Sequence, residues 1–179
     1  MAQLIVSLFL FCSLHLAAQN YTPADAGSDV KFTIKNFGLN VNGSFTGLQG
    51  KIIFDPVKPA TASFAVSVDA GTVNTGNGSR DKHLKKDDYF NVASYPKLSF
   101  VSTKVTASGK LGVYTIEGNL TIKGKSKMVS FPFTATTAAG GYQFSGQLKI
   151  NRRDFKVGGG SLVLSDELTV SLHILANKM

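Results

Sequence analysis

With 179 residues, the chain is long enough for one domain with a sizeable core and short for two domains. Hydrophobic residues make up 43% of the chain and charged residues only 17%, which excludes an intrinsically disordered protein. The net charge of +8 favours contact with anionic surfaces such as lipid head groups or phosphates, although solubility alone also explains it.

The first 19 residues have the features of a secretory signal peptide. They are apolar over residues 4–16 and end in small residues, and this apolar run is too short to span a bilayer comfortably. We therefore predict cleavage of residues 1–19, one domain over residues 20–179 and a periplasmic or secreted location. The mature chain then lacks cysteine, because the only one, Cys12, is removed with the signal.

The mature chain alternates between apolar and polar side chains, which is typical of β-strands with one buried face. A change of parity around Gly47 indicates a bulge or a sharp bend, and Pro132 indicates an edge, a bulge or imperfect closure of the sheet. The alternation predicts about eight strands, within residues 30–37, 41–54, 64–68, 98–105, 114–122, 129–135, 142–150 and 168–174.

Short, turn-rich connections predict that neighbouring strands pair antiparallel. A sheet with one apolar face buries that face by closing into a barrel or by packing as a sandwich. Residues 79–89 interrupt the alternation and favour one or two helical turns, with Asn77 or Ser79 as the N-cap. Such a helical segment between two barrel strands can cover an open end.

The same segment holds the densest group of polar side chains. His83 lies four residues before Asp87, so the two could share a helical face, but two ligands are too few for a structural metal site. The sequence contains no nucleophile elbow, no HExxH zinc motif and no phosphate-binding loop. We therefore predict no catalytic residue, no metal and no enzymatic activity, with His83 as the one remaining candidate for an enzyme.

Nucleic acid is not a predicted partner. Basic residues cluster near two turns, at residues 123–127 and 149–156. Barrels that bind single strands expose aromatic rings between such charges, whereas Phe131, Phe133 and Phe144 of this chain have inward parity.

The inward-facing residues define a candidate ligand pocket. An eight-stranded barrel either encloses one small ligand or fills its interior with side chains, and periodicity alone leaves both open. The candidate lining residues are Phe32, Ile34, Phe45, Phe54, Phe64, Val66, Phe100, Tyr114, Ile116, Phe131, Phe133, Phe144 and Leu148.

The sequence resembles the YceI-like family of polyisoprenoid-binding periplasmic proteins over essentially the whole mature chain. The resemblance rests on TGNGSRDKHLKKDDYFNVASYPKLSFVSTKV, YTIEGNLTIKGKSKMVSF, INRRDFKVGGG and SDELTVSLHI. It implies a lipocalin-like, antiparallel eight-stranded barrel with a long apolar pocket. It also implies a non-covalent ligand, an isoprenoid chain, a quinone-type lipid or another long-chain amphiphile, and no cofactor.

The family's two motifs, TGNxxRDxHL and RxDF, imply residues at the pocket mouth. Arg80 and Asp81 either brace the loop or contact the ligand, and Asp154 opposite Arg80 would form a buried ion pair. Where family members often carry histidines in the first strand, this chain has Gly27-Ser28 and Lys35-Asn36, so the identity of the lipid stays open. The motif residues are Asn77, Arg80, Asp81, His83, Asp154 and Phe155.

The sequence thus predicts an exported barrel that sequesters or transports a long-chain isoprenoid or similar amphiphile. Its expected partners are a long-chain lipid and, transiently, a membrane surface; monomer and homodimer are both open. The alternative is a structural or stress-response barrel whose core is filled by side chains.

Overall fold

The structure is a computed structural model and describes residues 19–179. The predicted signal peptide, residues 1–19, therefore lies outside the described residues except for its last position. Strand structure begins at Asn20, directly after the predicted cleavage site. Within the described residues, no helix is both long and apolar enough to cross a membrane.

Nine β-strands, one α-helix and three short 3-10 helices make up the described chain. The apolar–polar alternation places one side of each strand toward the interior. The strands are β1 (Asn20–Asn36), β2 (Leu39–Phe45), β3 (Gln49–Ile53), β4 (Ser63–Asp69), β5 (Lys97–Ala107), β6 (Val113–Ile122), β7 (Lys125–Ala138), β8 (Gly141–Asn151) and β9 (Leu164–Lys178). The helices are α1 (Gly78–Leu84), η1 (Pro59–Thr61), η2 (Ala70–Thr72) and η3 (Arg152–Phe155).

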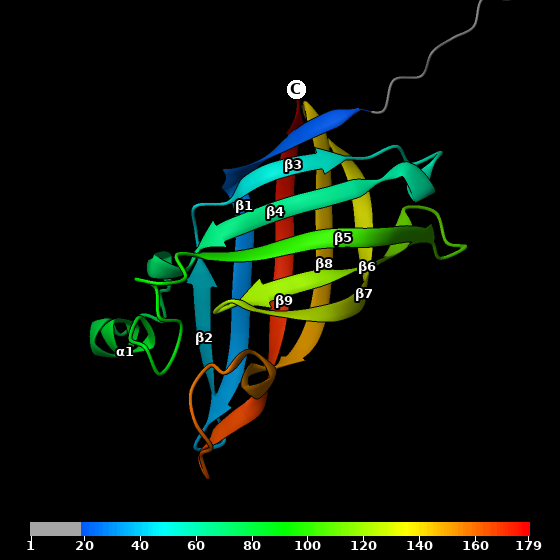
Figure 1. Cartoon of the computed structure of the whole chain (residues 1–179). Helices are drawn as coiled ribbons and strands as arrows, with labels where there is room; N and C mark the ends of the chain where they lie inside the picture. Colours follow the sequence, from blue (N-terminus) through cyan, green and yellow to red (C-terminus); the bar gives the residue numbers. More distant parts are fainter. Residues whose placement is uncertain (1–18) are drawn as a thin grey trace, which may run out of the picture.

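The sheet closes on itself because β1 pairs with strands at both ends of the sequence order. β1 pairs antiparallel with β9 over most of its length, and its first two residues pair with β3. Each strand from β3 to β9 pairs antiparallel with the next, so β1 and β3–β9 form an eight-stranded barrel. β2 pairs with the second half of β1, and this hairpin extends to the end of the molecule opposite the C-terminus (Figure 1). The predicted all-β, antiparallel eight-stranded barrel is confirmed.

The parity change at Gly47 is a sharp bend between β2 and β3. Gly47 has a φ of 75°, a conformation that glycine adopts without steric cost. The amides of Gly47 and Leu48 donate to the two carboxylate oxygens of Asp25, at 2.9 and 2.7 Å. Asp25 on β1 thus fixes the corner at which the chain leaves the β1–β2 hairpin and enters the barrel.

Pro132 lies where the pairing between β7 and β8 ends. It stands opposite Thr115 in the ladder between β6 and β7, which runs along most of β7. The ladder between β7 and β8 covers only residues 133–138, so residues 125–132 have no partner on β8. The helix η3 contacts β7, and its Phe155 is fully buried. The barrel wall is therefore incomplete between β7 and β8, as Pro132 indicates from the sequence.

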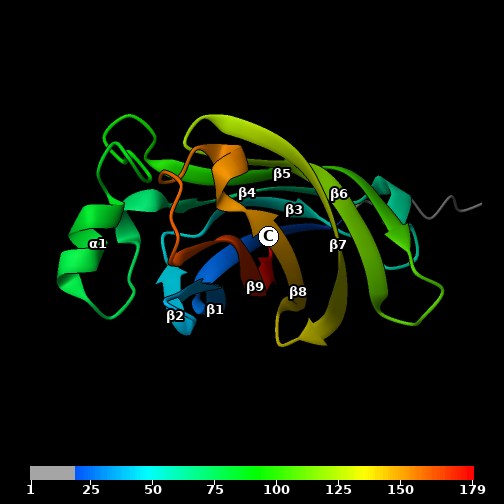
Figure 2. The same cartoon turned by 90° about the horizontal axis from the view of Figure 1, so that it is seen from below.

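Asn77 begins α1, since its side-chain oxygen accepts a hydrogen bond from the amide of Arg80 at 3.0 Å. The helix ends at Leu84 and is shorter than residues 79–89. Just before the helix, Asn74 pairs with Ser44 of β2, which holds this segment along the outside of the barrel. Figure 2 shows α1 beside the strands of the barrel, and Arg80, His83 and Leu84 of this helix border the interior.

Candidate functional site

The barrel contains an apolar cavity of about 660 Å³. Of the 45 residues that line it, 31 are Phe, Leu, Ile or Val, and none is Asp or Glu. Folded proteins are packed so tightly that voids much larger than a water molecule are few. A cavity of this size is therefore a built feature, and a core filled by side chains does not describe this barrel.

One end of the interior is closed by aromatic rings. Phe54 is 0% exposed, and its ring centroid lies within 6.4 Å of five other aromatic centroids, in edge-to-face arrangements. Tyr21 joins this group through Tyr142, at 5.5 Å. We call these seven side chains the aromatic base: Tyr21, Phe54, Phe64, Tyr114, Phe133, Tyr142 and Phe144.

Burial also changes the acidity of the aromatic base. It raises the pKa of Tyr21 and of Tyr114 above the ordinary value of 10.0, with smaller contributions from Tyr142 and Asp55. The Tyr21 hydroxyl donates to Gln19 at 2.6 Å, and the Tyr114 hydroxyl donates to the carbonyl of Pro56 at 3.5 Å. Burial in the barrel therefore favours the neutral form of both phenols.

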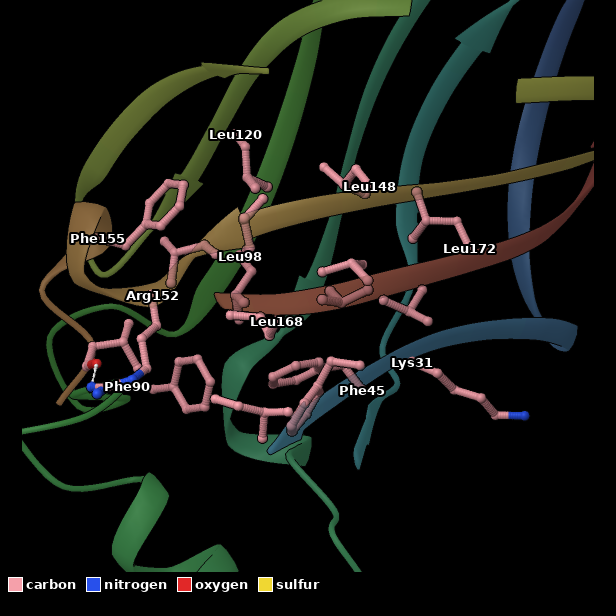
Figure 3. A pocket seen from close by; sticks show the side chains of 18 of the residues that line it. Lys31, Phe45, Phe90, Leu98, Leu120, Leu148, Arg152, Phe155, Leu168 and Leu172 are labelled. Carbon is pink, nitrogen blue, oxygen red and sulfur yellow. Dashed lines mark hydrogen bonds between the residues drawn. The ribbon is translucent and has the colours of Figure 1, made fainter. Parts of the chain in front are cut away.

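The other end of the cavity reaches solvent. At this end, the exposed residues that line the cavity belong to the β1–β2 hairpin, to α1 and to residues 159–163. We call the β1–β2 hairpin, residues 75–90 and residues 156–164 together the mouth. Between the mouth and the aromatic base the wall is mainly aliphatic. Figure 3 shows Leu98, Leu120, Leu148, Leu168 and Leu172 in this part of the wall.

Eleven of the thirteen candidate lining residues border the cavity. The other two, Phe54 and Tyr114, do not, which corrects the prediction. Both have the expected inward parity, but they lie in the aromatic base, where neighbouring rings occupy the space around them. The eleven are Phe32, Ile34, Phe45, Phe64, Val66, Phe100, Ile116, Phe131, Phe133, Phe144 and Leu148.

The first motif is organised around Thr75. The Asp81 carboxylate accepts hydrogen bonds from the amide and the hydroxyl of Thr75, at 2.9 and 2.6 Å. The Arg80 guanidinium donates to the hydroxyl and carbonyl oxygens of the same residue, at 2.7 and 2.9 Å. Arg80 and Asp81 thus fix the loop ahead of α1, and of the two only Arg80 also lines the cavity. Asn77 serves as the N-cap.

His83 lies at the cavity mouth and packs edge-on against Tyr89, with 4.8 Å between ring centroids. Asp87 follows the end of α1, so the helical face predicted for His83 and Asp87 does not form. Among residues 19–179, no group of three or more His, Cys, Asp or Glu side chains could hold a metal ion.

Arg152 is a buried charge that the sequence prediction missed. It is 4% exposed, and its guanidinium donates five hydrogen bonds to residues 157–166. Four acceptors are backbone carbonyls, and the fifth is the carboxylate of Asp166 at 2.6 Å. This arrangement satisfies a buried arginine and holds residues 157–164 in place at the mouth.

The second motif differs from its prediction. Asp154 is exposed and does not line the cavity, and no ion pair between it and Arg80 occurs among the described residues. The ion pair that does form is Arg152–Asp166, in which Arg152 is buried and Asp166 is about half exposed. Arg152 continues the inward parity of β8, whereas Asp154 follows it within η3, where the alternation of the strand no longer applies. Phe155 does line the cavity.

The sequence matches known proteins over nearly its full length. The profile of a family described as the YceI-like domain matches residues 21–176. A UPF0312 protein of Yersinia enterocolitica is 31% identical over 180 residues, which cover 96% of this chain and 93% of that protein. A UPF0312 protein of Photorhabdus laumondii is 30% identical over 185 residues, with 96% and 94% coverage.

Solved structures share the fold. BcnA of Burkholderia cenocepacia superimposes with a TM-score of 0.80 at 29% identity, covering 85% of this chain and 98% of that chain. A polyisoprenoid binding domain from Saccharophagus degradans, implicated in plant cell wall breakdown, superimposes with a TM-score of 0.70 and covers 91% and 100%. Its identity to this chain is 18%, so the comparison shows the fold alone.

Proposed function

The chain belongs to the YceI-like family, and from this premise we propose that its barrel binds the apolar tail of a long-chain isoprenoid or similar amphiphile. The observation that carries the proposal is the cavity of about 660 Å³, walled by Phe, Leu, Ile and Val and open at one end. This volume lies within the range of about 300–1,000 Å³ that is usual for small-molecule sites.

The cavity wall suits a hydrocarbon tail. Each methylene that moves from water into an apolar site contributes about 0.8 kcal/mol, so a long chain gains affinity with every carbon it buries. The aromatic base closes the far end, which limits the length of tail that the cavity accepts. The structural neighbour from Saccharophagus degradans is described as a polyisoprenoid binding domain, which makes an isoprenoid the first tail to test in this shared fold.

The mouth suits a polar or anionic head group. The charged side chains that line the cavity are Lys31, Arg80 and Arg152, and no carboxylate lines it. Arg80 and Arg152 already bond to the protein, so a head group would add to these contacts rather than replace them. The mechanism is sequestration or transport: the wall shields the tail, the mouth accommodates the head, and no covalent step is involved.

The proposed location is the periplasm or the extracellular space. The apolar residues 4–16 followed by small residues support export, and the family to which the chain belongs supports the same assignment.

The decisive experiment blocks the cavity from inside. Leu168 of β9 lines the cavity, and Trp at this position would fill part of it. We expect Leu168→Trp to weaken uptake of geranylgeraniol by roughly tenfold, measured by competition with a fluorescent fatty-acid probe. Thr169→Trp is the matched control, because Thr169 points to the opposite face of the same strand and does not line the cavity.

Native mass spectrometry of protein purified from its own host tests the proposal independently. A co-purified lipid in the wild type, lost in Leu168→Trp and kept in Thr169→Trp, supports it. Repeated recovery of lipid-free protein that takes up no added isoprenoid would overturn it.

A further inference from the structure

Four apolar side chains project into solvent at the mouth. Phe37 is 74% exposed, Leu39 is 73% exposed, Leu162 is fully exposed and Val163 is also exposed. Phe37 and Leu39 are at the tip of the β1–β2 hairpin, and the other two belong to the segment between η3 and β9. Figure 1 shows these two segments side by side at the end of the molecule opposite the C-terminus. We call the four residues the rim patch.

The backbone joins the two halves of the rim patch. The amide of Phe37 donates to the carbonyl of Val163 at 2.8 Å, and Asn36 pairs with Leu164. Phe37 and Val163 also line the cavity. The rim patch is therefore a fixed surface that continues directly into the apolar wall of the cavity.

The side chain of Phe37 does not contribute to the stability of the fold. It and Gly38 form a two-residue hairpin loop with φ values of 51° and 75°. Such a loop favours Asn-Gly, whereas a bulky side chain at positive φ is strained. A large ring that is both strained and exposed adds nothing to the core, so its presence points to a contact outside the protein.

The charge around the rim patch is basic. Lys35 lies two residues before Phe37, and Arg153 and Lys156 lie on the segment that leads to Leu162. All three are exposed, and none belongs to an ion pair among the described residues. Residues 30–45 and 152–164 together carry five Lys or Arg and one acidic residue, Asp154. Asp154 lies in a separate surface hollow that also contains Lys127 and Lys149.

We propose that the rim patch inserts into the surface of a lipid bilayer with anionic head groups, so that the cavity mouth faces the membrane. Exposed aromatic and aliphatic side chains beside basic residues are the combination that binds such interfaces. A tail could then pass from the bilayer into the cavity along an apolar path without crossing water. This inference rests on the proposed lipid-binding function and adds the surface through which the lipid arrives.

Vesicle flotation tests the inference with a substitution that separates membrane contact from folding. Phe37→Asn creates the Asn-Gly loop that the backbone prefers, so we expect a more stable barrel that binds vesicles less well. Combined with Leu162→Ser, it should weaken binding to phosphatidylcholine vesicles with about 30 mol% phosphatidylglycerol by roughly tenfold. The matched control is Leu111→Ser, an equally exposed leucine on the turn between β5 and β6, which should bind as the wild type does.

The outcomes distinguish this inference from the proposed function. If the wild type takes up geranylgeraniol but does not float with anionic vesicles, the membrane contact is wrong and lipid binding stands. If it floats but takes up no lipid, the proposed function is wrong. Flotation that Phe37→Asn/Leu162→Ser leaves unchanged would also overturn the inference. The inference would be overturned as well if the wild type self-associated but did not bind vesicles, and the double variant abolished the self-association.

Discussion

The aromatic base and the mouth are built on the same strands, yet their packing is opposite. In the aromatic base seven rings fill the barrel, and Phe54 at its centre has no exposure. Toward the mouth the wall consists mainly of aliphatic side chains around the cavity, and the exposed residues of the rim patch lie at its edge. One end of the barrel therefore supplies packing that stabilises the fold, and the other keeps space open at the cost of that packing.

At the mouth, hydrogen bonds take over the stabilising role that side-chain packing has in the aromatic base. Arg152 holds residues 157–165 through four backbone carbonyls, and Thr75 is held by Arg80 and Asp81. Polar bonds of this kind fix the position of a loop without filling the space beside it. The comparison predicts that stability depends on apolar packing at the base and on buried polar bonds at the mouth.

The largest effect is expected at the centre of the aromatic base. Phe54→Ala removes a ring that touches five others, so the free energy of unfolding should fall by about 3–5 kcal/mol. Urea unfolding followed by circular dichroism measures it. Phe37→Ala, the same change at the exposed mouth, should alter stability by no more than about 0.5 kcal/mol. Equal losses for the two variants would contradict the comparison.

A smaller loss is expected at the mouth. Arg152→Ala leaves buried carbonyls without a donor, and we expect the free energy of unfolding to fall by about 2–3 kcal/mol. Hydrogen exchange should become faster in residues 157–164 and stay slow in the aromatic base. Arg153→Ala, next to it but exposed, serves as the control and should change stability by about 0.5 kcal/mol or less. Unchanged exchange in residues 157–164 would show that Arg152 does not hold them.

The smallest expected effect is a loss of folding stability at alkaline pH that comes from the phenols of the aromatic base. The pKa of the Tyr114 phenol is raised in the folded protein by burial, so above pH 10.0 the unfolded chain loses this proton first. Its contribution to stability is complete below that pH and is lost as the pH rises toward the folded pKa. The variant Tyr21→Phe/Tyr114→Phe should therefore lose less stability than the wild type between about pH 9 and pH 11. Urea unfolding at several pH values measures this, and identical slopes would contradict it.

Strand positions and their inward faces were predictable because alternation reports them directly. The position of a residue along the barrel axis was not predictable. Phe54 and Phe64 both face inward, yet only Phe64 borders the cavity. Two inward-facing residues can lie at different distances from the mouth because of strand tilt and register, and both are set by pairings between distant segments. The resemblance to the YceI-like family indicated the pocket, and alternation alone did not.

The burial of Arg152 could have been predicted from the sequence. Leu148 and Ile150 face inward, and Arg152 is the next residue of that parity. An arginine at an inward position requires several acceptors, and the carbonyls of a glycine-rich segment five residues away are suitable ones. The rim patch was harder to predict. Phe37 has the outward parity of Lys35, so alternation indicates that it is exposed, but its position beside residues 162–163 depends on pairing between distant segments.

The closure of β1 on β9 places the two ends of the described chain together. Tyr21 pairs with Lys178, and the amide of Met179 donates to the carbonyl of Asn20 at 2.9 Å. Both ends therefore lie beside the aromatic base, opposite the β1–β2 hairpin (Figure 1). A purification tag, a fused protein or a solid support attached at either end would leave the opening directed away from the attachment point.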